Sequence, residues 1–298
     1  MDSLITFYQE RLNLQDTTFS RIVHDDAIVA IVYKITQPTG KTFILKICTR
    51  PEEYFRELYF LKHFAHILPV PQIINVIEPE ETIHGAILMS LLPGAPLKIT
   101  DITDKLAYEL GSLFARIHLN RTTGYGDLIQ PNNLTPDPRV YFSQQFETGF
   151  AECSGHLPTK LLEQCRNYYN THVNLLTSVD GPCIVHRDFR PGNVIVHKNK
   201  ISGIIDWATS RASFAEEDFR SIEHCWDWAT NPASKTNFLA GYASIRPVPN
   251  YNTIMPLLRL TRSLDIIGFT LKRNTWQSSN AHVYQFERQF LDTFFSNF

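Results

Sequence analysis

The residue types best suited to chemistry lie between His186 and Asn193, which reads HRDFRPGN, and in the segment IIDW, which contains Asp206. The spacing H-R-D-x-x-x-x-N places Asp188 five positions before Asn193, and Asp206 follows Asn193 by thirteen positions. In this pattern the first aspartate accepts the proton of a hydroxyl group, while the asparagine and a second aspartate bind metal. Carboxylate and amide oxygens suit Mg²⁺, a hard cation that prefers oxygen ligands. These residues predict phosphoryl transfer, with Asp188 as the base and with Asn193 and Asp206 on Mg²⁺.

The same residues also have a simpler explanation. Asp, Asn, Pro and Gly dominate turns, so HRD could be a chance tripeptide in a turn that includes Pro191 and Gly192. The flanking sequence favours the chemical interpretation, because short apolar runs that predict strands lie on both sides. These runs are CIV at 183–185, VIV at 194–196 and ISGII at 201–205. A polar loop held between rigid strands is a common place for catalytic groups.

The composition is that of a globular protein and excludes several classes of partner. The chain has 298 residues, of which 43% are hydrophobic and 19% are charged, so it is long enough for two lobes and a large core. A formal net charge of -2 gives no general field for nucleic acid or an anionic membrane, so we expect neither partner. The first residues do not resemble a secretory signal, and no apolar run is long enough to span a bilayer.

Five cysteines are scattered along the chain without a C-x-x-C pair. An odd number without paired spacing favours reduced thiols over a disulfide framework, so we expect a cytoplasmic protein. A zinc site formed by Cys183, His186 and His197 is disfavoured, because zinc needs three or four ligands at suitable spacing and no second pair exists.

The elements that must position these groups change in character along the chain. The first ninety residues predict strands and one helix, which begins with a capping box at Thr49–Glu52 and runs to about His66. From Asp101 onward, apolar residues recur at helical spacing. The change falls at the segment LPGAP, residues 92–96. We therefore predict an α+β fold of two lobes. The first, residues 1–92, is a small antiparallel-sheet lobe with one main helix, and the second, residues 93–298, is larger and mostly helical.

Lys46 is a charged residue inside the apolar strand FILKI. A buried amine is costly without a partner, and Glu57 on the following helix could pair with it. Glu53, one turn earlier, is a rival partner. In the simpler interpretation, Lys46 and Glu57 are solvent-facing charges on a one-sided sheet and a surface helix.

Taken together, these segments resemble the aminoglycoside phosphotransferase and choline kinase superfamily, the small-molecule branch of the protein-kinase-like fold. The resemblance covers roughly residues 20 to 220, and its most specific part is the HRDFRPGN motif. The other matching segments are ILKI at 44–47, RE at 56–57, VPQII at 70–74, ILMSLLPG at 87–94 and GIIDW at 203–207.

The resemblance implies a bilobal protein-kinase-like fold and transfer of the γ-phosphate of ATP or GTP to a hydroxyl of a small molecule, with Mg²⁺. It implies that Lys46 contacts the nucleotide phosphates and that Glu57 positions Lys46. Ser90, Leu91 and Leu92 would offer backbone groups to the base. His186 and Asp218 would support the catalytic loop, although a charge at the start of a helix explains Asp218 equally well.

The chain departs from the protein-kinase pattern at several places. The segment His24–Ile28 contains two aspartates and no glycine, whereas a Gly-rich loop covers the phosphates in protein kinases. Trp207 and Ala208 follow Asp206 where protein kinases have Phe and Gly, and no A-P-E triplet follows. The missing A-P-E triplet favours a small acceptor over a protein acceptor.

We expect the acceptor site in the acidic segment after Asp206. Glu217, Glu223 and Asp227, with Trp226 between them, could attract a cationic acceptor, because carboxylates and aromatic faces both bind ammonium groups. A solvated acidic helix whose tryptophans enter the core is the simpler alternative. A neutral sugar or nucleoside hydroxyl also stays open.

Two classes of function follow from the sequence. The first is a phosphotransferase that uses Mg²⁺ and ATP or GTP and acts on a small alcohol. The second is a kinase-like protein that binds a nucleotide or a small ligand without transferring phosphate. The glycine-free segment favours the second class, and the complete set of Asp188, Asn193 and Asp206 favours the first.

Overall fold

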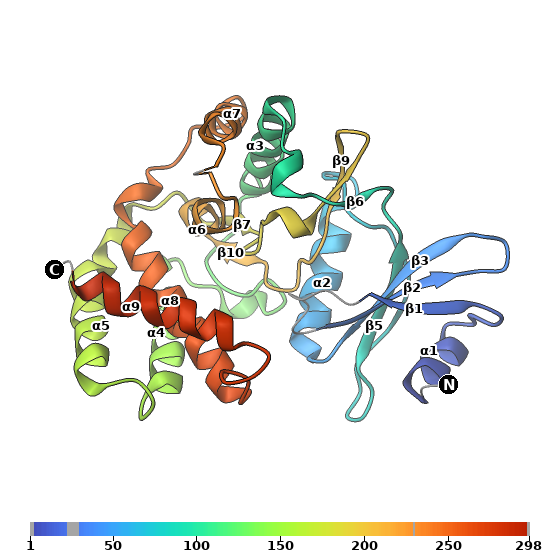
Figure 1. The fold of residues 1–298 in the computed structure, drawn as a ribbon, viewed down its shortest axis with the longest axis horizontal. Coiled ribbons are helices and arrows are strands. Elements are labelled where there is room, and N and C mark those ends of the chain that lie inside the picture. Colours follow the sequence, from blue (N-terminus) through green and yellow to red (C-terminus); the bar gives the residue numbers. More distant parts are fainter. Residues whose placement is uncertain (1–2, 23–29, 229, 297–298) are drawn as a thin grey trace. The chain divides into compact units, whose positions relative to one another are not determined.

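The structure is a computed structural model that describes residues 3–22, 30–228 and 230–296. It has the predicted α+β character, with an antiparallel sheet in the N-terminal part and mostly helices in the C-terminal part (Figure 1). The glycine-free segment His24–Ile28 lies outside the described residues.

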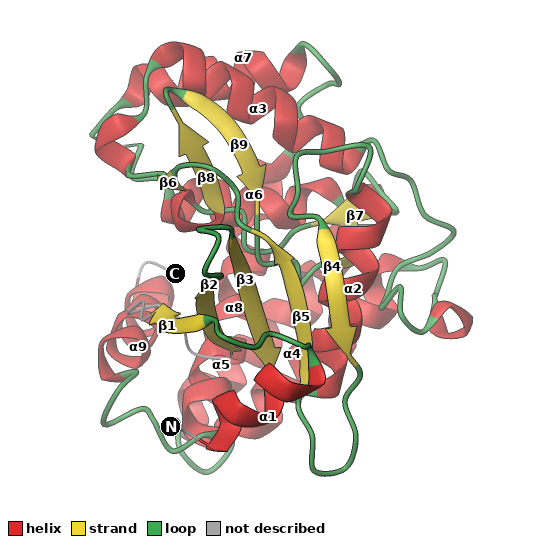
Figure 2. Ribbon diagram, turned by 90° about the vertical axis from the view of Figure 1, so that its right-hand side faces the viewer, coloured by secondary structure: helices red, strands yellow, loops and turns green. Residues whose placement is uncertain are grey.

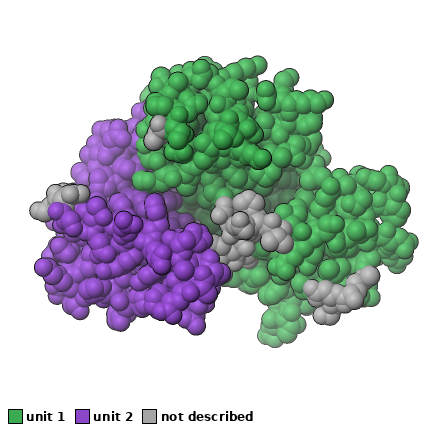
Figure 3. Space-filling model, in the orientation of Figure 1, with its two compact units in different colours: residues 1–119, 186–211, 221–247 green, residues 120–185, 212–220, 248–298 purple. Residues whose placement is uncertain are grey.

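The chain forms two compact units, which are coloured separately in Figure 3. Unit 1 contains residues 1–119, 186–211 and 221–247, and unit 2 contains residues 120–185, 212–220 and 248–298. The predicted boundary after Leu92 stays a prediction. The change from strands to helices falls close to it, because the fifth strand of the sheet ends at Ser90 and the first long helix after it begins at Asp104.

The N-terminal sheet belongs to unit 1 and has the strand order β1-β2-β3-β5-β4 (Figure 2). Its strands are β1 (Thr18–Ile22), β2 (Ala30–Thr36), β3 (Thr42–Cys48), β4 (Ile73–Ile77) and β5 (Gly85–Ser90). Alternate residues of β3, namely Phe43, Leu45 and Ile47, join a core with side chains from α1 (Ser3–Arg11) and the segment after it. Successive side chains of a strand point to opposite faces, so Lys46 points to the other face.

On that face, Lys46 contacts Glu57 of helix α2 (Pro51–Phe64). Pro51 stands in its first turn, where a missing N–H costs nothing. The predicted capping box at Thr49 is wrong, because the N-cap residue is Arg50, whose side chain makes no capping hydrogen bond. Arg50 instead forms an ion pair with Glu53, with Nη2 2.7 Å from Oε1.

Short strands frame the functional segments. Strand β7 (Cys183–Val185) precedes the HRDFRPGN segment, and the hairpin of β8 (Val194–His197) and β9 (Lys200–Ile204) follows it. Strand β6 (Ala95–Pro96) pairs with β8, and β10 (Arg211–Ser213) with β7. The sequence predicted β7, β8 and β9 because each is an apolar run between turn residues.

In unit 1, helices α3 (Asp104–His118) and α7 (Pro232–Ala243) pack closely against each other. Glycine allows the close approach, because a Cβ on Gly111 would lie 1.9 Å from the backbone oxygen of Phe238. The buried His118 ring nitrogen Nδ1 lies 2.8 Å from the hydroxyl of Tyr242 on α7. The helix pair therefore makes a rigid part of unit 1.

Unit 2 is a helical layer built on α4 (Pro138–Cys153), α5 (Thr159–His172), α8 (Met255–Lys272) and α9 (Ala281–Ser296). Their apolar faces share one core, which includes Phe146, Leu162 and Leu264. Helix α6 (Ala215–Cys225) has its first turns in unit 2 and its last turns in unit 1. Among the described residues, none of the helices has the length and apolar character needed to cross a bilayer.

Candidate active site

Lys46 lies between two carboxylates in unit 1. Its Nζ is 2.8 Å from Oε2 of Glu57 and 2.7 Å from Oδ1 of Asp206. Lys46 is 8% exposed and Glu57 is 2% exposed, whereas 44% of the Asp206 side chain is exposed. Of the two predicted partners, Glu57 contacts Lys46, because Glu53 is paired with Arg50. The strand lysine, the helix glutamate and the second aspartate of the motif thus meet, although they are far apart in the sequence.

The charges of this trio depend on one another. Burial disfavours the charged form of Lys46, but the carboxylates of Asp206 and Glu57 together outweigh burial and raise the pKa of Lys46. The Lys46 ammonium in turn holds the pKa of Asp206 below its ordinary value. Burial raises the pKa of Glu57, and Lys46 opposes that rise. Asp206 is therefore an anion near neutral pH, as a metal ligand must be.

The segment His186–Asn193, called the HRD loop from here on, is held by its own side chains. Nδ2 of Asn193 donates to the backbone oxygen of Asp188 at 2.9 Å and to its Oδ2 at 2.6 Å. Nε of Arg190 also donates to Oδ2 of Asp188, at 3.2 Å. Among the described residues, none donates to the other oxygen, Oδ1. Two donors thus fix the rotation of the Asp188 carboxylate and leave Oδ1 open to a substrate.

His186 ties the HRD loop to the segment that carries Asp206. Its ring is fully buried, and the backbone N–H of Asp188 donates to Nδ1 at 3.3 Å. Nδ1 is then an acceptor, so Nε2 carries the hydrogen and donates to the backbone oxygen of Ile205 at 3.2 Å. In addition, the N–H of Ile205 donates to the backbone oxygen of Asn193 at 3.0 Å. These bonds agree with the predicted supporting role of His186.

Two residues at the site have a left-handed backbone. Arg187 has φ 67° and Asp206 has φ 68°, which is uncommon for residues with a Cβ. Such conformations cost free energy and persist where the surroundings impose them, often at functional sites. At Arg187 the backbone oxygen accepts a hydrogen bond from Ser221 Oγ at 3.2 Å.

Trp207, which replaces the phenylalanine of the protein-kinase pattern, is fully buried beside Asp206. Its ring packs on Phe64 of α2, with ring centroids 4.7 Å apart, and on His186, with centroids 4.5 Å apart. Its indole N–H donates to the backbone oxygen of Ile204 at 3.3 Å. Trp207 therefore joins α2, the HRD loop and the end of β9 in one packed cluster.

The predicted metal ligands have the chemistry that Mg²⁺ needs. Oδ2 of Asp206 and Oδ1 of Asn193 accept no hydrogen bond from the described residues, so both oxygens are available to a cation. Within the described part of the chain, no cluster of three or more His, Cys, Asp or Glu side chains could hold a metal. A pair of protein oxygens suits Mg²⁺, which usually keeps several waters and takes further ligands from phosphates.

Ser90, Leu91 and Leu92, the residues predicted to contact the nucleotide base, differ in the contacts of their backbone groups. The N–H of Ser90 donates to the backbone oxygen of Gln72 at 2.9 Å, and the sheet register of β5 ends at Ser90. Leu91 and Leu92 lie beyond the last strand pair of β5.

Two of the predicted acceptor residues are buried. Trp226 is fully buried, and its two neighbours in the ring stack, Phe189 and Trp228, lie at centroid distances of 5.7 Å and 5.6 Å. Its indole N–H donates to the backbone oxygen of Phe189 at 2.9 Å. Glu217 is 3% exposed and accepts a hydrogen bond from Ser213 Oγ. In this arrangement the indole of Trp226 supports the HRD loop, and the acceptor roles of Trp226 and Glu217 stay predictions.

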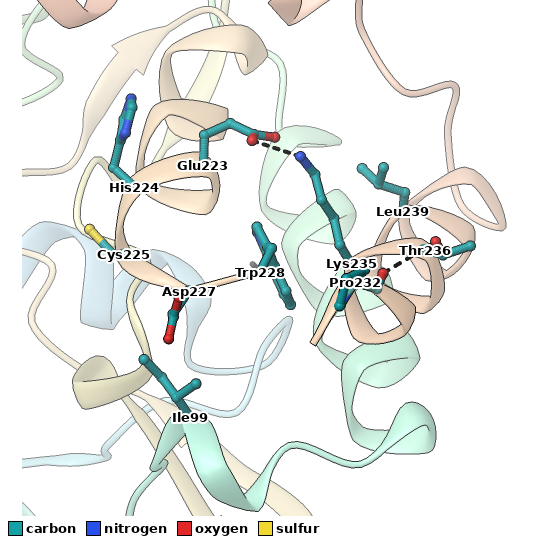
Figure 4. Close-up of a pocket in the computed structure, with 10 residues that line it drawn as sticks. All are labelled: Ile99, Glu223, His224, Cys225, Asp227, Trp228, Pro232, Lys235, Thr236 and Leu239. Carbon is teal, nitrogen blue, oxygen red and sulfur yellow. Dashed lines mark hydrogen bonds and ion pairs between the residues drawn. The ribbon is translucent and has the colours of Figure 1, made fainter. Parts of the chain in front are cut away.

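Glu223 and Asp227, the other two, line a pocket of about 820 Å³ in unit 1 (Figure 4). Glu223 and Lys235 point toward each other across it, with Nζ 2.7 Å from Oε2. Trp228 and Leu239 add apolar surface to the lining. Asp218 lies outside this pocket, in the first turn of α6, and is fully buried. Its predicted bracing role stays a prediction.

The sequence analysis missed two residues, Arg190, which contacts Asp188 in the HRD loop, and Lys235, which contacts Glu223 in the pocket. Arg190 could have been found, because a basic residue two positions after the predicted base is visible in the motif itself. Lys235 carries no such signal, since it lies on a separate helix twelve residues after Glu223.

Residues 21–254 match the model of a family described as the phosphotransferase enzyme family. A homoserine kinase from Gluconobacter oxydans (strain 621H) is 26% identical over 167 residues, which are 55% of this chain and 51% of that protein. A hygromycin-B 4-O-kinase from Escherichia coli is 22% identical over 209 residues, which are 60% of this chain and 54% of that protein. The chain thus spans about half the length of these curated relatives.

Solved structures resemble the chain over nearly its whole length. A thermostable mutant of the aminoglycoside phosphotransferase APH(4)-Ia, in a ternary complex with ADP and hygromycin B, has a TM-score of 0.71 at 15% identity and covers 98% of this chain and 97% of its own. The GDP and kanamycin complex of a second aminoglycoside phosphotransferase has a TM-score of 0.70 at 13% identity and covers 99% of both chains. At such low identity the likeness concerns the fold, which is the predicted kinase-like one.

Proposed function

Because the chain belongs to the phosphotransferase enzyme family, we propose that it transfers the γ-phosphate of ATP or GTP to a hydroxyl group of a small molecule. The observation that carries the proposal is the HRD loop, in which Asp188 is fixed through Oδ2 by Asn193 and Arg190 while Oδ1 is open. A carboxylate held in this way is suited to a base that must meet an incoming hydroxyl.

In the proposed reaction, Oδ1 of Asp188 accepts the proton of the acceptor hydroxyl. The hydroxyl oxygen forms a bond to the γ-phosphorus as the bond from that phosphorus to the bridging oxygen breaks, and the nucleoside diphosphate leaves. Because the transition state is loose, the protein contributes mainly positioning and charge neutralisation. The hydrogen bond from Asn193 to Oδ2 keeps the carboxylate in position throughout.

The donor nucleotide would be held by groups on the N-terminal sheet. Lys46 would contact its phosphates, and Glu57, 2.8 Å from Lys46 Nζ, would position the ammonium. Leu91 and Leu92 would offer their backbone groups to the base. The relatives of known structure were solved with ADP or GDP, so both ATP and GTP are candidates for the donor.

The residues that would hold Mg²⁺ are Asp206, through Oδ2, and Asn193, through Oδ1. When bound, the ion neutralises charge on the phosphates. Lys46 donates a hydrogen bond to Oδ1 of Asp206 and leaves Oδ2 for the ion, so one carboxylate can bind both the ammonium and the ion.

The acceptor is proposed to be a small molecule, and Glu223 and Asp227 are proposed to contact it in their pocket. Two carboxylates favour a cationic group, while the Glu223–Lys235 ion pair offsets part of the negative charge. Because the relatives named above act on acceptors as different as homoserine and hygromycin B, their names leave the acceptor of this chain open. A neutral sugar or nucleoside hydroxyl is the alternative.

The proposal is tested first by nucleotide binding and then by transfer. We expect Mg-ATP or Mg-GTP to raise the melting temperature, because a ligand that binds only the folded state stabilises it. An acceptor screen that includes homoserine, aminoglycosides, choline-like alcohols and sugars should then yield a phosphorylated product. Asp188→Asn should lower the rate by roughly a hundredfold or more, because it removes the base.

Asp188→Asn should still bind the nucleotide, and its melting temperature without ligand serves as the folding control. The absence of any shift with either nucleotide would contradict the proposal. A shift without transfer to any acceptor would favour the alternative function, binding of a nucleotide or small ligand without phosphoryl transfer.

A further inference from the structure

Arg190 places a cation beside the proposed base. Its Nε lies 3.2 Å from Oδ2 of Asp188, and 23% of its side chain is exposed. Arg190 is therefore next to the carboxylate that would meet the incoming hydroxyl.

The backbone of Arg190 is fixed on both sides. Its N–H donates to the backbone oxygen of Asp188 at 3.0 Å, and its own oxygen accepts from the N–H of Asn193 at 2.9 Å. The buried Pro191 follows it in a short 3-10 helix. Because the backbone of Arg190 is fixed, the base of its side chain has a defined position, as a catalytic group requires.

Gly192 leaves room for the Arg190 side chain. A Cβ on Gly192 would lie 2.9 Å from Nη1 of Arg190, and the only other heavy atom within 4 Å is Cζ of the same residue. An alanine at position 192 would therefore displace the end of the arginine side chain while leaving the backbone of the loop in place. The chain thus offers a way to move the guanidinium without changing Arg190 itself.

Asn193 holds the carboxylate of Asp188 more closely than Arg190 does. Asn193 already donates to the same oxygen at 2.6 Å, which is shorter than the 3.2 Å bond from Arg190. A guanidinium stays charged at any physiological pH, and its planar donors match the oxygens of a phosphate. A transferring phosphoryl group gathers charge on its equatorial oxygens, where a cation stabilises it.

We propose that Arg190 is a further catalytic residue, whose guanidinium pairs with Asp188 in the free protein and donates hydrogen bonds to the oxygens of the transferring phosphoryl group. This inference rests on the proposed function. Arg190 keeps its protons throughout, and the hydroxyl proton still goes to Asp188. The guanidinium offsets the repulsion between the phosphoryl oxygens and the carboxylate of Asp188, so its effect is largest in the transition state.

The test compares Arg190→Gln and Arg190→Lys with the unchanged protein, using Mg-ADP alone and Mg-ADP with aluminium fluoride, which mimics the transferring phosphoryl group. We expect Arg190→Gln to bind Mg-ADP with unchanged affinity but to lose about 10- to 100-fold in affinity for the aluminium fluoride complex. Its transfer rate should fall by about 100- to 1000-fold with little change in the KM for nucleotide. Arg190→Lys keeps the charge but not the planar donors, so its affinity for the aluminium fluoride complex should lie between those of Arg190→Gln and the unchanged protein.

Gly192→Ala serves as the second probe. It should lower the affinity for the aluminium fluoride complex, and it should add little in a protein that already carries Arg190→Gln, because both changes act on one guanidinium. Melting temperatures of all variants separate misfolding from loss of the interaction.

The outcomes distinguish the two proposals. If the unchanged protein does not prefer the aluminium fluoride complex over Mg-ADP, the proposed function fails and the role of Arg190 fails with it. If the unchanged protein shows the preference and Arg190→Gln retains all of it, Arg190 only orients Asp188, and this inference alone is overturned.

Discussion

At the scale of single residues, the site is built on charges that support one another. Lys46 contacts Glu57 and Asp206, and Asp188 receives hydrogen bonds from Asn193 and Arg190. Both carboxylates of the motif therefore have a cationic partner and one oxygen that the described residues leave unused. Lys46 and Glu57 are buried, and removing one member of a buried charged pair leaves its partner uncompensated, so both contribute to stability.

The Lys46–Asp206 pair predicts a specific pH dependence. The pKa of Asp206 in the folded protein lies below its ordinary value of 3.8, so the pair stabilises the fold above that value, and the stabilisation is lost as the pH falls through the lowered pKa. Asp206→Asn should therefore reduce the free energy of unfolding near neutral pH, and the difference from the unchanged protein should shrink below pH 3.8. Urea unfolding at a series of pH values measures this difference.

The exposed Asp101 provides a matched control for this experiment. Asp101→Asn removes the same charge without breaking a buried contact, so it should change stability little across the series. A difference for Asp206→Asn that stays constant down to pH 3 would argue against the pair as its cause.

At the scale of elements, loops and helices hold the site through aromatic rings. Trp207 joins the end of β9 to α2. Trp226, just after α6, supports the HRD loop through a ring stack with Phe189 and a hydrogen bond to its backbone oxygen. Ring packing contributes both apolar burial and a preferred geometry. Trp207 and Trp226 thus pack in the structure as supports for the functional segments, whereas the cation-binding role was predicted for Trp226 alone.

This difference predicts the effect of Trp226→Phe. The change keeps a ring but removes the donor to the buried oxygen of Phe189, so it should lower the free energy of unfolding by about 1–3 kcal/mol. The KM for the acceptor should change little, because the indole has no open face. Denaturant unfolding and acceptor kinetics measure the two quantities.

Trp276→Phe is the control, because among the described residues the indole of Trp276 has ring contacts with His156 and Tyr284 and donates no hydrogen bond. It should have a smaller effect on stability. A Trp226→Phe protein with unchanged stability and a strongly raised acceptor KM would instead support the original prediction that Trp226 binds the acceptor.

At the scale of the whole molecule, the core of each unit covers all but one of the thiols. Cys48, Cys153, Cys165 and Cys183 are buried, whereas Cys225 at the end of α6 is exposed, and none of the five forms a disulfide. Burial raises the pKa of Cys48, of Cys153 and of Cys165 to about 12 in each case. Only the thiolate reacts readily, so burial suppresses the reactivity of these cysteines in two ways.

We therefore expect a thiol reagent at mildly alkaline pH to label one cysteine rapidly in the native protein and all five after unfolding in denaturant without reductant. Cys225→Ser should abolish the rapid phase and leave the total at four. Rapid labelling of two or more thiols in the native protein would show that one of the units opens more easily than its burial indicates.

The sequence alone was sufficient for the HRD loop and for the strands around it, because motif spacing and strand alternation act between residues close in the chain. Lys46 was identified for the same reason, since a charge inside an apolar strand needs a partner wherever the strand lies. The α+β character followed from the change in periodicity at the segment LPGAP, residues 92–96, and the helices and strands of the structure confirm this character.

Tertiary packing decided the rest. Glu53 and Glu57 lie one turn apart and are chemically equal in the sequence. Only the approach of α2 to β3 selects Glu57, while Arg50 takes Glu53. Trp226 and Glu217 are polar or aromatic groups next to a motif, and only the packing of α6 and of the segment after it turns them inward. The pairing of Lys235 with Glu223 likewise depends on where α6 and α7 meet in space, which local spacing does not encode.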